Sequence, residues 1–250
     1  MKVAAVQHDI AWEDRDATLE ELTRRLATIE ADLIVLAELF AVGFTMAREV
    51  AEPPDGPTTQ WLVSQAAARA AWVGGSIPVV LAGADRPSNV FTLASPTGEV
   101  HRYAKRHPFA YAGEDEHYAP GDARVTVDVD GVRTSLTVCY DLRFADAYWP
   151  LAADTDLYLV VASWPQARRH HWRTLLAARA IENQAYVVGV NRVGSGGGLD
   201  YAGDTCIIDP LGEVLASAAA VETVVLADVD PAVVAKVRAE LPFLVDRRND

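Results

Sequence analysis

The sequence predicts an α/β fold, in which helices cover the faces of β-sheets. The opening of the chain carries this prediction. Residues 3–7 form an apolar strand, a capping-box sequence at 18–21 predicts a helix start, and apolar residues then recur at helical spacing as far as Ile29. A second strand at 32–37 is apolar throughout, so we expect it to be covered on both faces. Strand, helix and buried strand in this order are typical of layered α/β proteins.

The rest of the chain continues this alternation. In the first half we expect a loop at 53–57, a helix at 58–71, a strand at 76–82, a hairpin of strands 89–94 and 100–104, and a loop at 106–121. The middle of the chain then predicts a hairpin turning at Asp130-Gly131, a strand at 132–138, a helix-like segment at 142–149, a strand at 156–162, a helix at 171–184 and a strand at 185–190. After these we expect a flexible loop at 194–198, a hairpin at 205–216, a strand at 223–229, and a short helix with a tail to Asp250. Asp-Gly between two strands favours a type I′ turn. Because no linker divides the chain, we expect one domain over residues 1–250.

Composition excludes several classes of partner. Acidic residues number 35 against 22 basic ones, which gives a net charge of −13. We therefore expect no nucleic-acid partner and no anionic membrane surface. No apolar run reaches the roughly 18 residues that span a bilayer, and the N-terminus turns polar at Gln7, too early for a signal peptide. The two cysteines form no C-x-x-C pair, which favours a reducing cytoplasm.

Cys139 occupies an unusual position in this pattern. The apolar, β-branched strand 132–138 ends at this cysteine, Tyr140-Asp141 break the pattern, and the segment after them is closed by Pro150. A thiol at a sharp strand-to-helix turn projects from the end of a sheet, where backbone N–H groups can bind developing negative charge. A lone cysteine is more often a core residue, and we interpret Cys206, in mid-strand, in that way.

Two other chemically active residues also follow strands. Glu38 ends the strand at 32–37, and Lys105 ends the strand at 100–104. If these strands lie parallel to the strand before Cys139, all three side chains emerge at one edge of a sheet, where open α/β sheets bind ligands. The loop at 106–121 crowds aromatic, histidine and acidic residues together, which is typical of a functional loop or lid.

The three residues form a chemically coherent set. A thiol has a pKa near 8.5 and requires a base to become a nucleophile at neutral pH. Glu38 could accept the proton of the thiol. Lys105 and the Tyr140 backbone N–H could together stabilise the oxyanion of a tetrahedral intermediate. Protonated Glu38 then donates its proton to departing ammonia and, as a base again, activates water against the thioester.

These motifs resemble the nitrilase superfamily of carbon–nitrogen hydrolases. The matching segments are Leu36-Ala37-Glu38-Leu39-Phe40, Tyr103-Ala104-Lys105-Arg106-His107, Val138-Cys139-Tyr140-Asp141-Leu142-Arg143-Phe144, Asn191-Arg192-Val193-Gly194 and Gly203-Asp204-Thr205. The resemblance implies a four-layer α-β-β-α sandwich that pairs into a homodimer or higher homo-oligomer, and the order Glu…Lys…Cys of that family's catalytic triad. It also implies a second active-site glutamate, Glu114 with Glu116 in reserve, and a reaction of a small amide with water that uses no metal and no other cofactor.

Within the superfamily, the chain resembles the bacterial ω-amidase branch. Residues 38–46 and the segment Ser163-Trp164-Pro165 carry this likeness, which implies a dicarboxylic mono-amide such as 2-oxoglutaramate or 2-oxosuccinamate. Such a substrate needs a cation for its remote carboxylate, and the planar guanidinium of arginine suits that task. Arg168, with Arg169 beside it, is the candidate, although a solvated role is equally open. Phe44 and Trp164 are candidates for the pocket wall.

Other functions remain open at this point. The same scaffold serves aliphatic amidases, N-carbamoyl amidases and nitrilases. A cysteine–histidine hydrolase that uses His107 or His117 is a second alternative, and a non-catalytic binding module on the same fold is a third. The adjacent pair His170-His171 does not predict a metal site, because neighbouring helical residues point to different faces.

Overall fold

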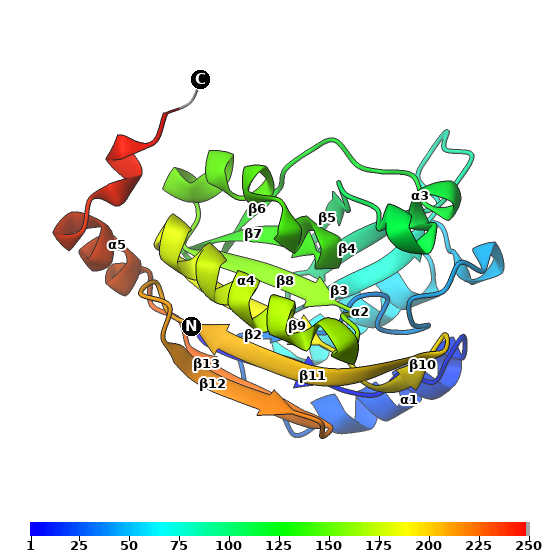
Figure 1. Cartoon of the computed structure of the whole chain (residues 1–250). Helices are drawn as coiled ribbons and strands as arrows, with labels where there is room; N and C mark the ends of the chain where they lie inside the picture. Colours follow the sequence, from blue (N-terminus) through cyan, green and yellow to red (C-terminus); the bar gives the residue numbers. More distant parts are fainter. Residues whose placement is uncertain (249–250) are drawn as a thin grey trace.

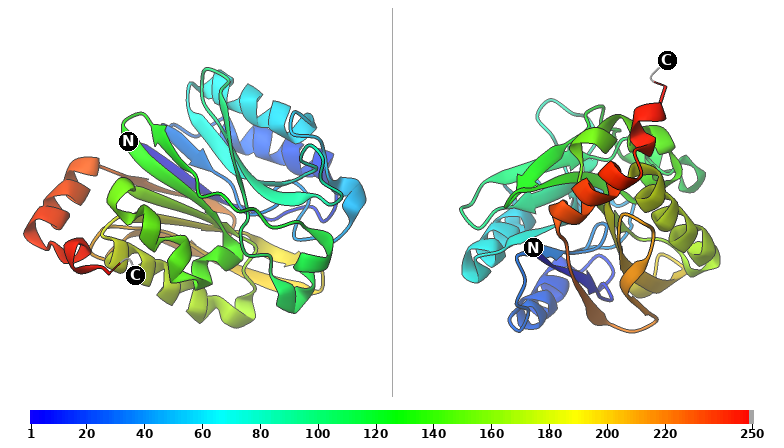
Figure 2. Two further views of the ribbon diagram at one scale, coloured as in Figure 1. Left: turned by 90° about the horizontal axis from the view of Figure 1, so that it is seen from above. Right: turned by 90° about the vertical axis from the view of Figure 1, so that its left-hand side faces the viewer.

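The structure is a computed structural model that describes residues 1–248. Residues 249–250, the end of the expected C-terminal tail, lie outside the described residues. Two mixed β-sheets pack face to face, and helices cover their outer faces, so the chain forms four layers (Figures 1 and 2). This is the α-β-β-α sandwich that the sequence resemblance implies.

The first sheet has six strands and the second has seven. The order in the first is β13 (Thr223–Asp228), β1 (Lys2–Gln7), β2 (Leu33–Val35), β3 (Trp72–Val79), β4 (Ser88–Ala94) and β5 (Val100–Ala104). The order in the second is β10 (Val193–Gly196), β11 (Leu199–Ile208), β9 (Tyr186–Asn191), β8 (Leu157–Ala162), β7 (Val132–Val138) and β6 (Thr126–Val129), with β12 (Val214–Ala219) paired to β11. Each sheet has a parallel centre, β1-β2-β3 in one and β7-β8-β9 in the other.

Helices complete the outer layers. The α-helices are α1 (Arg15–Leu26), α2 (Pro57–Arg69), α3 (Glu114–His117), α4 (Arg169–Asn183) and α5 (Pro231–Glu240). Short 3-10 helices are η1 (Arg48–Val50), η2 (Ala110–Ala112), η3 (Cys139–Arg143), η4 (Ala145–Ala147), η5 (Trp149–Asp154), η6 (Gln166–Arg168) and η7 (Phe243–Asp246). No helix within residues 1–248 has the length and apolar character needed to cross a membrane.

Three apolar clusters hold the layers together. The central cluster lies between the sheets and takes buried side chains from both, such as Leu33 from β2 and Leu159 from β8. A second cluster packs the first sheet against α1 and α2, and a third packs the second sheet against α4. Because β2 and β8 are covered on both faces, their continuous apolar sequence is explained by burial.

The structure corrects four local predictions. Helix α1 begins one turn early, because the Asp14 side chain caps it by accepting from the Ala17 N–H at 3.0 Å. Strand β3 begins at Trp72, since α2 ends at a left-handed Ala70. Residues 142–149 form short 3-10 turns rather than one helix, and residues 194–198 lie in the tight β10–β11 hairpin rather than in a flexible loop.

The predicted type I′ turn is confirmed. Asp130 and Gly131 both have positive φ, 50° and 85°, as this turn requires. The turn joins β6 to β7 and so delivers the chain to Cys139.

Candidate active site

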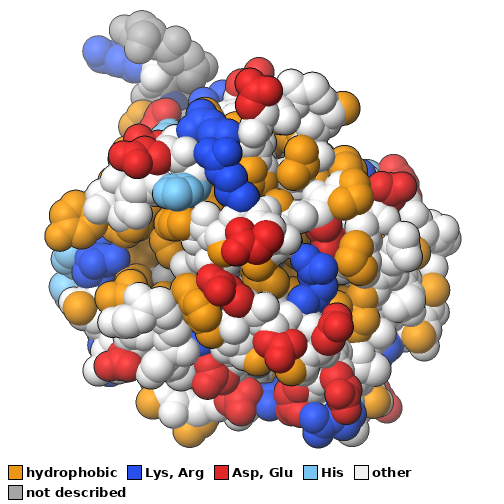
Figure 3. Space-filling view, turned by 90° about the vertical axis from the view of Figure 1, so that its right-hand side faces the viewer, with side chains coloured by type: hydrophobic (Ala, Val, Ile, Leu, Met, Phe, Trp, Pro, Cys, Tyr) orange, Lys and Arg blue, Asp and Glu red, His pale blue; other side chains and the backbone are white. Residues whose placement is uncertain are grey.

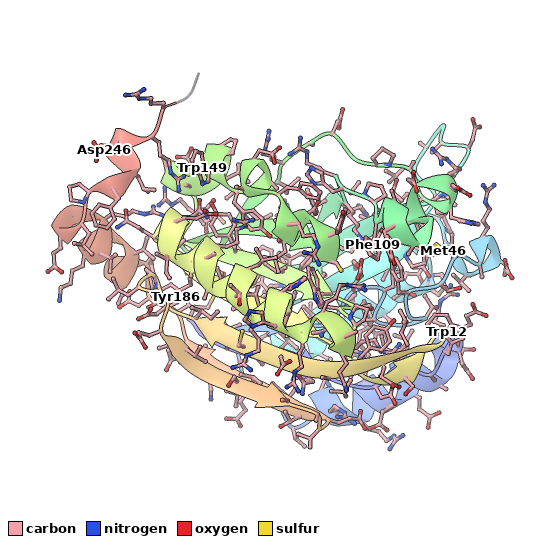
Figure 4. All side chains as sticks on the ribbon, viewed as in Figure 1. Trp12, Met46, Phe109, Trp149, Tyr186 and Asp246 are labelled. Atoms are coloured by element: carbon pink, nitrogen blue, oxygen red, sulfur yellow. The ribbon has the colours of Figure 1, made fainter. Side chains whose placement is uncertain are left out.

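The candidate residues meet between the ends of strands from both sheets. Glu38 follows β2 and Lys105 follows β5, both in the first sheet, whereas Cys139 follows β7 in the second. The expectation that all three emerge at one edge of one sheet is therefore wrong: the two packed sheets bring them together. Phe109, beside this site, lies in the right-hand half of the molecule in Figure 4, and Trp149 and Asp246 lie at the opposite end.

Glu38 is fully buried and fully hydrogen-bonded. Its Oε1 accepts from Lys105 Nζ and from Asn89 Nδ2, both at 2.8 Å. Its Oε2 accepts from the Ser163 backbone N–H at 2.8 Å, and its own carbonyl accepts from Ser163 Oγ at 3.2 Å. Donors from three separate segments therefore fix the orientation of this carboxylate.

Lys105 lies between two carboxylates. Besides Glu38, its Nζ donates to Glu114 Oε2 at 2.8 Å and to Glu114 Oε1 at 3.0 Å. The Phe109 N–H and Asn89 Nδ2 also donate to Glu114. Of the two predicted candidates for the second glutamate, Glu114 is thus in the cluster, and Glu116 is exposed to solvent.

Cys139 stands on strained backbone. It is the first residue of η3 and has φ of +44°, a left-handed conformation that non-glycine residues rarely adopt. The Arg179 guanidinium donates to the carbonyl of Leu142 in the same turn, at 2.8 Å from Nη2. Tyr140 follows Cys139 at the opening of η3, where backbone N–H groups have no partner within the helix.

The electrostatics of the cluster favour a neutral thiol beside charged neighbours. Burial raises the pKa of Cys139 well above its ordinary value, and the negative charge of Glu38 acts in the same direction against the opposing effect of Lys105. Burial on its own would lower the pKa of Lys105, but the charges of Glu114 and Glu38 outweigh it and raise that pKa well above its ordinary value. Burial also raises the pKa of Glu114, against the effect of Lys105. Lys105 is therefore charged while the thiol keeps its proton.

A largely apolar pocket, partly open to solvent, lies over Cys139. Its lining includes the predicted residues Phe44, Tyr140, Trp164 and Arg168. Phe44 also lies under the cluster, with its ring centroid 5.4 Å from Lys105 Nζ. Arg169, the other predicted arginine, is outside this pocket and pairs with Asp204 at 2.8 Å.

Sequence reasoning missed several residues of the site. Arg143 lines the pocket and stacks 4.7 Å from the ring centroid of Trp164. Tyr201, from β11, also lines it, and burial raises the pKa of its hydroxyl to about 12. Asn89 and Ser163 bind Glu38 as described above. The available signal for Asn89 was its position, because an asparagine begins the predicted strand that pairs with the strand before Lys105. Arg143 lies within the segment 138–144, which carries part of the family resemblance.

His107, the histidine of one alternative chemistry, is held by a carboxylate outside the pocket. His107 Nδ1 lies 2.8 Å from Asp141 Oδ1, and its ring stacks on Phe144 at 4.1 Å between centroids. It does not line the pocket over Cys139. Within residues 1–248, no three His, Cys, Asp or Glu side chains cluster in a way that could hold a metal ion. Cys206 is buried in β11, as expected for a core thiol.

Comparison with known proteins gives consistent results. Residues 2–239 match the family model described as carbon-nitrogen hydrolase. The chain is 43% identical to the omega-amidase YafV of Escherichia coli K12 over an alignment of 221 positions, which covers 87% of this chain and 85% of that protein. It is 31% identical to the 2-oxoglutaramate amidase of Bacillus subtilis over an alignment of 256 positions, which covers 99% of this chain and 98% of that one.

A solved structure agrees over the whole chain. The crystal structure of XC1258 from Xanthomonas campestris, a CN-hydrolase superfamily protein with an arsenic adduct in its active site, superposes with a TM-score of 0.93 at 36% identity. The match covers 100% of this chain and 98% of that one. The four-layer fold is therefore shared with this superfamily.

Proposed function

The chain belongs to the carbon–nitrogen hydrolase family, and we propose that it hydrolyses the terminal amide of a small dicarboxylic mono-amide such as 2-oxoglutaramate. One observation carries this proposal. A cysteine beside a buried Glu–Lys–Glu cluster opens onto an apolar pocket that also contains two arginines, Arg143 and Arg168. Such a site combines an amide-cleaving end with groups that bind a carboxylate.

The first half of the proposed reaction forms a thioester. Glu38 accepts the proton of Cys139 as Sγ attacks the amide carbon, and the carbonyl oxygen becomes an oxyanion. The Lys105 ammonium and the Tyr140 backbone N–H stabilise that charge. The intermediate collapses as protonated Glu38 donates its proton to the amide nitrogen, and the C–N bond breaks to release ammonia.

The second half restores the enzyme. Glu38 accepts a proton from a water molecule, whose oxygen attacks the thioester carbon. Collapse of the second oxyanion breaks the C–S bond, the acid departs, and the proton returns to Cys139. The hydrogen bonds from Asn89 and Ser163 keep Glu38 in one orientation through both halves.

We assign Glu114 a supporting role in this scheme. It holds Lys105 with both carboxylate oxygens, at 2.8 and 3.0 Å, while the Phe109 N–H holds Glu114. Lys105 thus has a fixed position from which to meet the oxyanion. The hydrogen bond from the Phe109 N–H to Glu114 also joins the loop that lines the pocket to the cluster.

The pocket supports a substrate with a carboxylate at its far end. Phe44 and Trp164 supply apolar walls, and Arg168 lies with its guanidinium carbon 5.3 Å from the ring centroid of Phe109. We propose that Arg168 and Arg143 together bind the remote carboxylate. The net charge of −13 does not oppose this, because acidic and basic side chains are interspersed over the face in Figure 3 rather than forming one acidic patch.

The test is ammonia release from a panel of compounds: 2-oxoglutaramate, succinamate, an N-carbamoyl amino acid, an aliphatic amide and a nitrile. Cys139→Ala is the blank and is expected to be inactive but folded. Preference for the first two compounds supports the proposal. Turnover of only the other compounds would discard the substrate assignment and keep the family chemistry.

The arginines are tested with the preferred compound. We expect Arg168→Met and Arg143→Met to raise KM by roughly ten- to hundredfold, the effect of losing a hydrogen bond to a charged group, and to leave turnover of a neutral aliphatic amide unchanged. Arg169→Met is the matched control, because Arg169 is adjacent in sequence but outside the pocket. Unchanged KM in both pocket variants would contradict the assignment.

We also propose that the enzyme acts as a homodimer in the cytoplasm. Trp149, Ile181 and Phe243 are large apolar side chains with 45%, 54% and 61% of their surface exposed. Arg247 stacks on Trp149 and donates to the carbonyl of Glu182, the residue after Ile181. An apolar surface of this kind favours self-association, which light scattering would measure, and a reducing compartment suits a cysteine nucleophile.

A further inference from the structure

The buried carboxylate of Asp141 makes four polar contacts of 3.0 Å or less. Asp141 lies two residues after Cys139 and has no solvent exposure. Its Oδ2 accepts from Tyr103 Oη at 2.7 Å and from the Val138 N–H at 3.0 Å. Its Oδ1 accepts from the His107 N–H at 3.0 Å and lies 2.8 Å from His107 Nδ1.

These donors belong to the two segments that deliver the reacting groups. Tyr103 and His107 lie two residues before and two residues after Lys105, at the end of β5 in the first sheet. Val138 directly precedes Cys139, at the end of β7 in the second sheet. A single carboxylate therefore binds both the chain that carries Lys105 and the turn that carries Cys139.

The backbone at Cys139 requires such support. A left-handed residue other than glycine is strained and persists only where its surroundings impose it. The hydrogen bond from the Val138 N–H to the Asp141 carboxylate spans Cys139 and so stabilises the turn around it. Arg179, bound to the carbonyl of Leu142, holds the same turn from α4.

We propose that Asp141 is a positioning residue, which together with Tyr103 and His107 sets the distance between Sγ of Cys139 and the ammonium of Lys105 across the two sheets. Asp141 itself does not line the pocket. It acts through the backbone on either side of the reacting groups. Its loss therefore leaves substrate affinity largely unchanged and lowers the rate of the chemical steps, because small displacements of reacting groups are costly to rate.

The first test removes one hydroxyl from this network. Tyr103→Phe keeps the buried ring and deletes the hydroxyl, which donates to Asp141 and accepts from the Arg106 N–H at 3.4 Å. Tyr158→Phe is the control, since Tyr158 is similarly buried in the second sheet and its hydroxyl donates to the carbonyl of Tyr148, at 3.1 Å, rather than to Asp141. We expect kcat to fall about ten- to hundredfold in Tyr103→Phe, with KM within about twofold, and kcat to stay near wild type in Tyr158→Phe. Equal kcat in the two variants at matched thermal stability would overturn the proposal.

The second test replaces the carboxylate. Asp141→Asn keeps the shape but presents an NH₂ to one of the two pairs of donors, so we expect a larger fall in kcat than in Tyr103→Phe. In the double variant that combines Tyr103→Phe with Asp141→Asn, no hydroxyl competes for the one side-chain oxygen that remains at position 141. The two effects on kcat should therefore be less than multiplicative, the signature of residues in one network. Strictly multiplicative effects would contradict a shared positioning role.

The proposal rests on the proposed amidase chemistry, and a second readout separates the two. The rate at which methyl methanethiosulfonate modifies Cys139 depends on the groups around the thiol and on no substrate. We expect about a tenfold change in this rate in Tyr103→Phe and none in Tyr158→Phe, with Cys206 buried in both. If no amide in the panel is turned over but the modification rates differ in this way, the proposed function fails and the positioning role stands. If turnover is normal and both rates match wild type, the positioning role fails alone.

Discussion

At the scale of single residues, the resting state of Cys139 follows from its surroundings. Burial and the charge of Glu38 both favour the neutral thiol, and Lys105 is already held by two carboxylates. The proposed nucleophile is therefore generated only when Glu38 accepts its proton. This differs from cysteine enzymes in which a neighbouring cation keeps a preformed thiolate.

This difference predicts how the thiol ionises. We expect no ultraviolet thiolate absorbance from Cys139 at pH 7, because its pKa is raised by burial first and by Glu38 second. The thiolate should form only above the ordinary range of about 8.5. Cys206 does not interfere at neutral pH, since burial raises its pKa to about 12.

The measurement is the difference in absorbance between the wild type and Cys139→Ser across pH 6 to 10. A thiolate signal below pH 7 that disappears in Cys139→Ser would show a preformed thiolate and contradict the proposed role of Glu38 as base.

At the scale of elements, strand ends and the turns after them build the site. Strand β11 brings Tyr201 to the pocket, and its course depends on a close approach to β1 at Gly203. Gly203 has φ of +68°, and a Cβ there would lie 2.1 Å from Oε1 of Gln7. Gln7 is buried, accepts from the Thr205 N–H at 3.0 Å and donates to the carbonyl of Val221 at 2.8 Å. It has no room to move without losing these bonds.

We therefore expect Gly203→Ala to destabilise the protein strongly. Gly198→Ala is the matched control, because Gly198 also has a positive φ, +77°, but faces open space. The control should lose about 1 kcal/mol from backbone strain alone, and Gly203→Ala should lose about 1–3 kcal/mol more from overpacking. Urea unfolding measures both values, and similar losses would show that Gln7 yields easily.

At the scale of the whole molecule, the packing of the layers buries ionisable groups in their neutral forms. Burial raises the pKa values of Tyr103, Tyr148 and Tyr158, in addition to those of both cysteines. The unfolded chain releases these protons near the ordinary values of about 8.5 for cysteine and 10 for tyrosine. The folded chain retains them to higher pH.

This predicts a loss of stability in alkali. A group with a raised folded pKa stabilises the fold fully below its unfolded pKa, and this contribution is lost as pH rises from there toward the folded pKa. The free energy of unfolding should therefore be nearly level up to about pH 8 and fall above about pH 8.5, first through the cysteines and then through the tyrosines.

Urea unfolding between pH 7 and 10.5 measures this fall. Cys206→Ala should reduce the slope between pH 9 and 10 by about one proton, since Cys206 then no longer contributes and lies outside the proposed site. A slope that is the same in this variant would show that Cys206 does not retain its proton in the folded state.

Local pattern was enough to predict much of the fold and part of the site. The apolar strands, the turn at Asp130-Gly131 and the strand-end positions of Glu38, Lys105 and Cys139 were all available from periodicity and turn chemistry, because these depend on neighbouring residues. The motifs around the three residues were sufficient to indicate the family that the comparisons show.

Only the tertiary structure decided how these pieces meet. The Ser163 N–H that binds Glu38 is 125 residues away along the chain, and Tyr201 reaches the pocket from β11. The position of Glu114 in the cluster, and of Arg143 beside Arg168 in the pocket, depends on which side chain faces inward from a short α-helix or a 3-10 turn. Periodicity specifies which face of a strand is buried, but it carries no information on which distant strand end comes to lie opposite, since that is set by the packing of one sheet on the other.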